Sequence, residues 1–263
     1  MFIGGPLEFN PDILLSEVIG HPNDQLGIAD SKICWTRSGR SALSIVLNLY
    51  KEDFSDGWFL LPDYQCWGVN DVFSSINCKY TPINKDLILD PNLLESALED
   101  NELKGVLLID YFGLTNIEKS IDLIKSRRPD IIVIIDAAMS FFSLLRYKEK
   151  YPKADAIIAS PRKFLPVPDG GLVVTREEDL LGHIKNKNQI NQEQISAYLS
   201  ASILRVLRKT ANLGEELSQE IESIYLRLFQ EHNSLFDNQI NCISSLSMEI
   251  IKRSNLDGLS NQR

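Results

Sequence analysis

Residues 131–138 read IIVIIDAA, five consecutive β-branched residues followed by an aspartate and two alanines. An apolar run of this kind is typical of a strand buried on both faces, as in a parallel sheet covered by helices. Such sheets bind ligands beyond the carboxyl ends of their strands, which is where the pattern places Asp136. A carboxylate that caps the next helix would give the same pattern. A ribose-binding acid of a dinucleotide fold is disfavoured, because no G-x-G-x-x-G motif lies upstream.

The sequence around this strand has the alternation of an α/β fold from residue 30 to about residue 175. Short β-rich runs alternate there with segments of helical period, which predicts a mostly parallel sheet flanked by helices. The predicted strands are Trp58–Leu61, Cys78–Ile83, Gly105–Ile109, Ile131–Ile135, Ala156–Ala159 and Gly171–Val174. The predicted helices are Ser41–Tyr50, Asn70–Ser75, Pro91–Asp100 and Asn116–Ser126, the third of which begins at an Asp-Pro pair.

The pattern changes after Thr175. The segments Arg176–Asn186, Asn191–Leu213 and Glu215–Phe236 are polar, Leu/Ile-periodic and almost free of Pro and Gly, which predicts long helices. The tail Met248–Arg263 is polar and shows neither a cap nor a stop signal. We therefore expect a large α/β domain over residues 1–175. The helical segment over residues 176–263 is expected to lead toward a small C-terminal domain that this chain lacks.

Composition excludes several classes of protein. With 263 residues, 44% of them hydrophobic, the chain is neither disordered nor fibrous. A net charge of −9 and the lack of a basic run argue against a nucleic-acid partner. No apolar run approaches the roughly 20 residues that span a bilayer, and Met1 to Glu8 carry no positive charge ahead of an apolar stretch, so a cytoplasmic protein is expected. Scattered histidines predict no metal site, and the cysteine spacing predicts free, buried thiols.

Two polar turns could hold a ligand. Residues 36–43, TRSGRSAL, pass from a glycine-containing turn into an apolar helix, and the backbone N–H groups of such a helix start bind anions. Ordinary N-capping is the alternative interpretation. Residues 61–67, LPDYQCW, place aromatic side chains just after a predicted strand. An aromatic there could stack on a flat cofactor or pack in the core.

A third stretch surrounds one lysine. Residues 160–171, SPRKFLPVPDGG, contain three prolines and two glycines around Lys163. A lysine held in an ordered, partly apolar loop loses its proton more easily and can act as a nucleophile, whereas most loop lysines are solvated surface charges. The Ser-x-x-Lys spacing also matches the acylating motif of penicillin-binding enzymes, but the companion S-D-N and K-T-G elements are absent.

The order of these motifs resembles the DegT/DnrJ/StrS family of pyridoxal-phosphate-dependent sugar aminotransferases, which belong to the fold-type I superfamily. The resemblance extends from Gly4 to about Val174. Lys163, six residues before an acid and a Gly-Gly pair, is its most specific part. The other matching motifs are Gly4–Leu7, Ser38–Leu43, Pro62–Tyr64, Tyr111–Gly113 and Asp136–Ala138.

The resemblance implies a role for each matching residue. Lys163 resembles the lysine that bonds to the cofactor and then moves the substrate proton, and Asp136 the acid that keeps the pyridine nitrogen protonated. Three positions depart from the family pattern: Arg40 replaces a threonine, Met139 a glutamine or histidine, and Ile158 a phosphate-binding serine. The resemblance further implies cofactor contacts from Gly39, Arg40, Ser41 and Ser160 at the phosphate and from Tyr64 or Trp67 at the ring.

The implied activity is transfer of an amino group from an amino-acid donor, glutamate in particular, to a keto-sugar nucleotide. The family resemblance places this reaction in cell-surface polysaccharide or related sugar biosynthesis and implies a homodimer that binds pyridoxal phosphate. Two alternatives stay open at this point. One is a fold-related dehydratase or non-sugar transaminase, and the other is a catalytically silent protein that binds pyridoxal phosphate, which Met139 and the missing domain favour.

Overall fold

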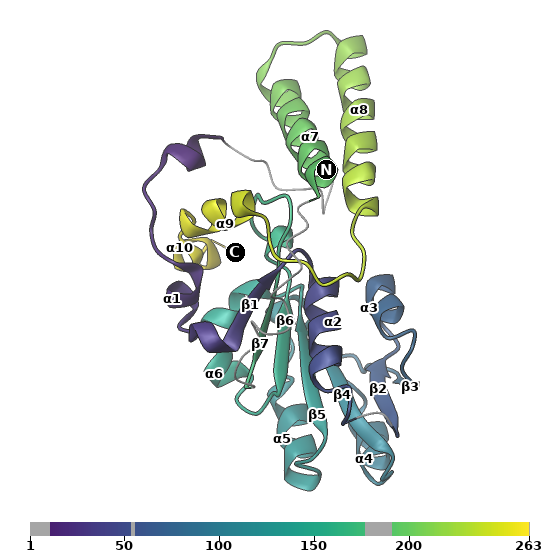
Figure 1. Ribbon diagram of the computed structural model, residues 1–263. Helices are drawn as coiled ribbons and strands as arrows, with labels where there is room; N and C mark the ends of the chain where they lie inside the picture. The colour runs from purple at the N-terminus through teal and green to yellow at the C-terminus, as the bar shows by residue number, and fades with distance from the viewer. Residues whose placement is uncertain (1–10, 54–55, 177–190, 263) are drawn as a thin grey trace.

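The computed structural model describes residues 11–53, 56–176 and 191–262 (Figure 1). The Gly4–Leu7 motif and nearly all of the predicted helix Arg176–Asn186 lie outside this part of the chain. Within it, no helix is both long enough and apolar enough to cross a membrane.

A seven-stranded sheet forms the centre of the molecule, in the order β1-β7-β6-β5-β4-β2-β3 (Figure 1). Strand β7 is antiparallel to both of its neighbours, and the other pairings are parallel. The α/β fold and every predicted strand are confirmed. The strands are β1 (Ile33–Thr36), β2 (Trp58–Pro62), β3 (Cys78–Thr81), β4 (Leu103–Ile109), β5 (Ile132–Ala137), β6 (Ala156–Ala159) and β7 (Gly171–Thr175).

Strand β1 was not predicted, and it determines where the next helix begins. Because β7 runs against the rest of the sheet, β1 lies antiparallel to β7 and therefore parallel to β6. The carboxyl end of β1 then reaches the same edge as the carboxyl ends of β5 and β6. Thr36 at the end of β1 pairs with Gly171, and Ala159 at the end of β6 pairs with Leu172 and with Ala137 of β5. The carboxyl ends of β1, β5 and β6 therefore lie at one edge of the sheet.

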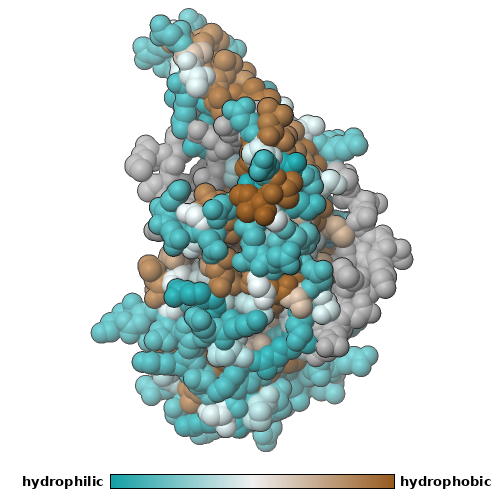
Figure 2. All heavy atoms as spheres, turned by 90° about the vertical axis from the view of Figure 1, so that its left-hand side faces the viewer, coloured by the Kyte–Doolittle hydropathy of each residue, from teal (hydrophilic) through white to brown (hydrophobic). Residues whose placement is uncertain are grey.

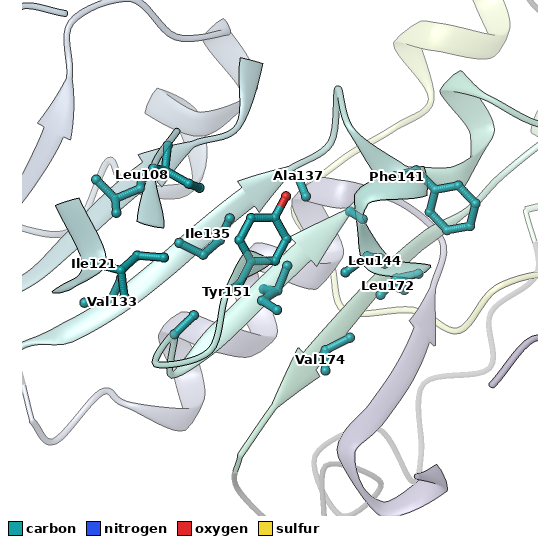
Figure 3. Packing of buried hydrophobic residues seen from close by; sticks show 14 of the residues in the cluster. Leu108, Ile121, Val133, Ile135, Ala137, Phe141, Leu144, Tyr151, Leu172 and Val174 are labelled. Atoms are coloured by element: carbon teal, nitrogen blue, oxygen red, sulfur yellow. The ribbon is translucent and has the colours of Figure 1, made fainter. Parts of the chain in front are cut away.

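Alternation along the strands separates two cores. Val133 and Ile135 of β5 pack in the cluster shown in Figure 3, with side chains of neighbouring strands and of α5. Ile132 and Ile134 pack on the opposite face, against α2 and α3. Since successive side chains of a strand point to opposite faces, Asp136 shares the α2 face with Ile132 and Ile134.

The helices lie on both faces of the sheet, and several differ in extent from the predictions. Helix α3 begins at Trp67, three residues before the predicted start, while α4 begins at Pro91 as predicted, with Asp90 as its N-cap. The α-helices are α1 (Pro22–Leu26), α2 (Gly39–Leu49), α3 (Trp67–Val72), α4 (Pro91–Leu98), α5 (Glu118–Arg127), α6 (Tyr147–Lys150), α7 (Gln192–Thr210), α8 (Glu215–Ser234), α9 (Ser245–Lys252) and α10 (Leu256–Ser260).

Helices α7 and α8 form a long hairpin that projects away from the sheet (Figure 1). Both helices were predicted, with ends shifted by up to three residues. Hydrophobic surface gathers along this hairpin in Figure 2, and Ile203 of α7 is 61% exposed and Leu217 of α8 47% exposed.

The chain returns from the hairpin to the sheet, so the prediction of an uncapped polar tail after Met248 is wrong. Helices α9 and α10 are capped by Ser244 and Asn255, whose side chains accept hydrogen bonds from Ser247 N and Gly258 N. Ile250, Ile251 and Leu256 of these helices are completely buried in the core. Most polar residues of this tail are partly or fully exposed, and they obscured the apolar pattern of helices of only eight and five residues.

Burial of Ile251 predicts a stability effect. Ile251→Ala should lower the free energy of unfolding by about 2–5 kcal/mol, because it removes buried apolar surface and leaves a cavity. Ile203→Ala, the same change at a position that is 61% exposed, is the matched control and should shift it by less than about 0.5 kcal/mol. Denaturant titration measures both, and equal effects would show that the C-terminal helices do not belong to the core.

Candidate active site

A cavity of about 210 Å³ opens at the carboxyl edge of the sheet, on the face that α2 covers. Its walls come from the starts of α2 and α3, the ends of β5 and β6, the turn after β6 and the end of the α7–α8 hairpin. The residues that line it are Ser38, Gly39, Arg40, Leu43, Cys66, Trp67, Gly68, Val69, Asp136, Ala138, Ile158, Ser160, Arg162, Lys163 and Phe236.

Asp136 provides a buried carboxylate at one wall of the cavity. Its Oδ1 atom accepts a hydrogen bond from Ala138 N at 2.8 Å, whereas Oδ2 has no donor in the described part of the chain. Burial raises the pKa of Asp136, and the nearby charge of Lys163 and the Ala138 hydrogen bond act in the opposite sense. A cationic N–H group in the cavity would meet an acceptor here.

Lys163 ends a short 3₁₀ turn, Pro161–Lys163, which follows β6. Lys163 is partly accessible to solvent through the cavity, but protein atoms surround its ammonium group. The resulting desolvation lowers the pKa of Lys163. The charge of Arg162 acts in the same direction and that of Asp136 against it. The Lys163 Nζ atom lies 3.3 Å from the sulfur of Met139, a weak acceptor that leaves the amine available to a ligand.

The start of α2 forms another wall. Ser38 caps the helix by accepting a hydrogen bond from Ser41 N at 3.1 Å. A side chain at Gly39 would come within 3.7 Å of Ser160 Cβ, so the helix start and the end of β6 are in contact. Gly171 makes this approach possible, since a Cβ atom there would lie 2.2 Å from the Ser38 carbonyl group.

Two guanidinium groups also reach the cavity. Arg40 lies 5.8 Å from the Trp67 ring and 3.9 Å from the Asp71 carboxylate. Arg162 lies 4.2 Å from the Phe236 ring, and its NH1 atom donates to Asn233 Oδ1 at 3.3 Å.

Asp169, the acid of the Lys163 motif, lies outside the cavity and holds the C-terminal segment. Its carboxylate accepts hydrogen bonds from Ser244 N at 2.9 Å, from Ser244 Oγ at 2.6 Å and from Ser247 Oγ. The loop that carries Lys163 is thereby fixed to the start of α9.

The predicted site residues divide into two groups. Ser41 and Tyr64 do not line the cavity: Ser41 Oγ donates to Gln239 O, and Tyr64 is 62% exposed and stacks on Tyr111 at 5.7 Å. The predicted residues that line the cavity together are Gly39, Arg40, Trp67, Asp136, Ser160 and Lys163.

Sequence reasoning missed several lining residues. Arg162 adjoins Lys163 in the chain, and Cys66 adjoins Trp67. Both could have been proposed because they are next to predicted site residues. Phe236 gave none, because it arrives from the far end of α8. The prediction of buried thiols is wrong for Cys66, which is exposed; all four cysteines are free. Among the described residues, no cluster of His, Cys, Asp or Glu could hold a metal ion.

Solved structures share this architecture. A protein described as NifS-like aligns over 98% of this chain and 68% of its own, with 12% identity and a TM-score of 0.58. A putative sugar aminotransferase from Streptococcus pneumoniae, in its PMP form, aligns over 99% and 68%, with 13% identity and a TM-score of 0.54. The aminotransferase TlmJ from Streptoalloteichus hindustanus aligns over 97% and 60%, with 14% identity and a TM-score of 0.54.

This chain has the fold of the fold-type I pyridoxal-phosphate-dependent enzymes. At 12–14% identity the similarity establishes the fold alone, and the chain spans 60–68% of the length of these three proteins. No family model and no curated protein matches the sequence.

The buried carboxylate predicts a pH-dependent stability. The pKa of Asp136 is raised above the value of an unfolded aspartate, about 3.9, so the free energy of unfolding falls as the pH rises from that value through the folded pKa. Asp136→Asn should remove this loss and make the ligand-free protein more stable than wild type at pH 7. The gain should be about 1.4 kcal/mol for each unit by which the pKa is raised.

Denaturant titrations between pH 4 and pH 8 measure this effect, and the difference should shrink toward pH 4. Asp86→Asn is the matched control, because Asp86 is an exposed carboxylate remote from the cavity. A variant at position 136 that is less stable than wild type at pH 7 would contradict the prediction.

Proposed function

We propose that this chain is a pyridoxal-phosphate-dependent aminotransferase whose cofactor binds in the cavity at the carboxyl edge of the sheet. The observation that carries the proposal is the meeting of Lys163 and Asp136 in one cavity of this fold. A reactive amine and a buried carboxylate in one cavity are the two groups that pyridoxal phosphate chemistry requires of a protein.

The side chains present fit this cofactor in charge and hydrogen bonding. Asp136 has a free Oδ2 atom for a protonated pyridine nitrogen, and Lys163 has an amine with only a weak acceptor beside it. The α2 start and Ser160 offer donors to a phosphate, and the guanidinium group of Arg40 adds positive charge.

When bound, pyridoxal phosphate supplies an electron sink for charge that develops on a substrate carbon. Asp136 is proposed to keep a proton on the ring nitrogen by placing a carboxylate beside it in a desolvated wall. Lys163 would hold the cofactor through Nζ and, as a free amine, would accept the proton of the substrate carbon and return it. Its lowered pKa increases the fraction of neutral amine that can accept this proton.

A keto-sugar nucleotide acceptor and a glutamate donor are proposed for the reaction, in the manner of the DegT/DnrJ/StrS family. The motif order from Ser38 to Gly171 supports this assignment, as does the structural likeness to the putative sugar aminotransferase from Streptococcus pneumoniae. The reaction would belong to polysaccharide or related sugar biosynthesis.

A homodimer is also proposed, in which a second copy covers the mouth of the cavity. Exposed apolar side chains follow three strands at this edge: Trp67 is 70% exposed, Phe112 58%, Leu114 84% and Met139 37%. Phe112 has a positive φ of 60°, an unfavourable conformation for a bulky residue. A second copy would remove these side chains from water.

Lys163 should be the site of covalent cofactor attachment. Incubation with pyridoxal phosphate, borohydride reduction and peptide mass mapping should place the label on Lys163, and Lys163→Ala should abolish it. Lys85→Ala, at an exposed lysine remote from the cavity, is the control and should be labelled as wild type is. Undiminished labelling of the Lys163 variant would overturn its role.

Asp136→Asn should separate binding from turnover. A neutral amide cannot stabilise the protonated ring nitrogen, so we expect conversion of bound cofactor to its amine form by glutamate to slow at least about a hundredfold. The variant should still retain bound cofactor, which is measured by the absorbance of the protein after gel filtration. Near-normal conversion by this variant would show that another group protonates the ring.

A further inference from the structure

Arg162 differs from most arginines of the described chain in having no carboxylate within ion-pair distance. The pairs Arg37–Asp237, Arg127–Glu95, Arg128–Asp130, Arg208–Glu222 and Arg253–Glu249 all lie within 3.3 Å. Arg162 is held instead by an amide oxygen, Asn233 Oδ1 at 3.3 Å, and by the face of the Phe236 ring at 4.2 Å. These contacts fix the guanidinium without an anionic partner in direct contact, and the carboxylate that acts on its charge is Asp169, which is hydrogen-bonded to Ser244 and Ser247.

A second cation faces the same cavity. Arg40 lines it from the start of α2, and its Asp71 partner is 3.9 Å away, at the limit of an ion pair. Desolvation and the charge of Arg40 together lower the pKa of Arg162 to about 10. Two neighbouring guanidinium groups that are partly removed from water repel each other, and an anion between them relieves both costs.

Arg162 lies close in the chain to residues of the wall that the α2 start and the end of β6 form. Arg162 follows Ser160 by two residues, and Ser160 is in contact with the α2 start, because a Cβ atom on Gly39 would lie 3.7 Å from Ser160 Cβ. Arg162 also directly precedes Lys163. Arg162, the α2 start and the reactive amine therefore line one cavity, so an anion held by Arg162 lies in the cavity that the other two share.

We propose that Arg162 is a ligand of the phosphate of pyridoxal phosphate and forms, with Arg40, a two-guanidinium clamp on it. The inference rests on the proposed function. It assigns to Arg162 the charge that the hydroxyl groups of Ser38 and Ser160 cannot supply, since a guanidinium offers paired donors to phosphate oxygens.

The clamp also connects the cofactor to the α7–α8 hairpin. The residues that hold Arg162, Asn233 and Phe236, lie at the C-terminal end of α8, and Phe236 itself lines the cavity. Phosphate binding should therefore protect the end of α8 from hydrogen exchange.

Binding of pyridoxal phosphate and of pyridoxal, which lacks the phosphate, tests the proposal without any turnover. Wild type should bind pyridoxal phosphate more tightly. Arg162→Met should weaken pyridoxal phosphate binding by about 10- to 100-fold, the range for one charge-assisted interaction, and leave pyridoxal binding unchanged. Arg162→Lys should restore part of the loss. Arg227→Met, at an arginine whose side chain is 69% exposed, is the matched control.

Several outcomes would overturn the proposal. If Arg162→Met binds pyridoxal phosphate as wild type does, Arg162 is not a phosphate ligand. If it loses both ligands equally while its circular dichroism is native, the residue maintains the cavity and does not recognise phosphate. If Arg162→Met fails to fold, the same comparison is made with Arg162→Lys: its affinity for pyridoxal phosphate relative to its affinity for pyridoxal decides between the outcomes. Wild type that binds neither ligand would instead refute the proposed function, and the clamp with it.

Discussion

The reversed direction of β7 is the constraint on which the cavity depends. An antiparallel strand inserted between β1 and β6 makes β1 parallel to the remainder of the sheet, so that its carboxyl end arrives beside those of β5 and β6. The start of α2 then reaches the wall that carries Asp136 and Lys163. Gly171 at the beginning of β7 is part of the same constraint, since only the absence of a Cβ atom lets the Ser38 backbone approach.

The buried charged groups of the cavity lower the stability of the ligand-free protein, and a ligand of complementary charge would offset that cost. One buried carboxylate faces one amine and two guanidinium groups, and burial disfavours the charged form of Asp136, Lys163 and Arg162 alike. A cationic ring nitrogen and a dianionic phosphate would each satisfy an opposite charge that the protein leaves exposed to the cavity. Functional sites commonly carry such a cost in stability.

Much of the fold followed from the sequence, because β4, β5 and β7 are largely apolar runs of five to seven residues. Strand β1 was missed because Ile33–Thr36 is short, lies next to charged residues and pairs with a strand far along the chain. Asp136 and Lys163, which both line the cavity, were singled out from motifs adjacent to strands. Phe236 enters the cavity through tertiary packing that no local pattern encodes. Ser41 was predicted from an evident motif, but it does not line the cavity, because its hydroxyl group donates a hydrogen bond to Gln239 O.

A crystal structure of this chain grown with pyridoxal phosphate tests the central claim most directly. The claim predicts electron density continuous with Lys163 Nζ, a ring nitrogen within hydrogen-bond distance of Asp136, and a phosphate between the α2 start and the guanidinium groups. Density for the cofactor at another lysine, or a ring whose nitrogen points away from Asp136, would contradict it.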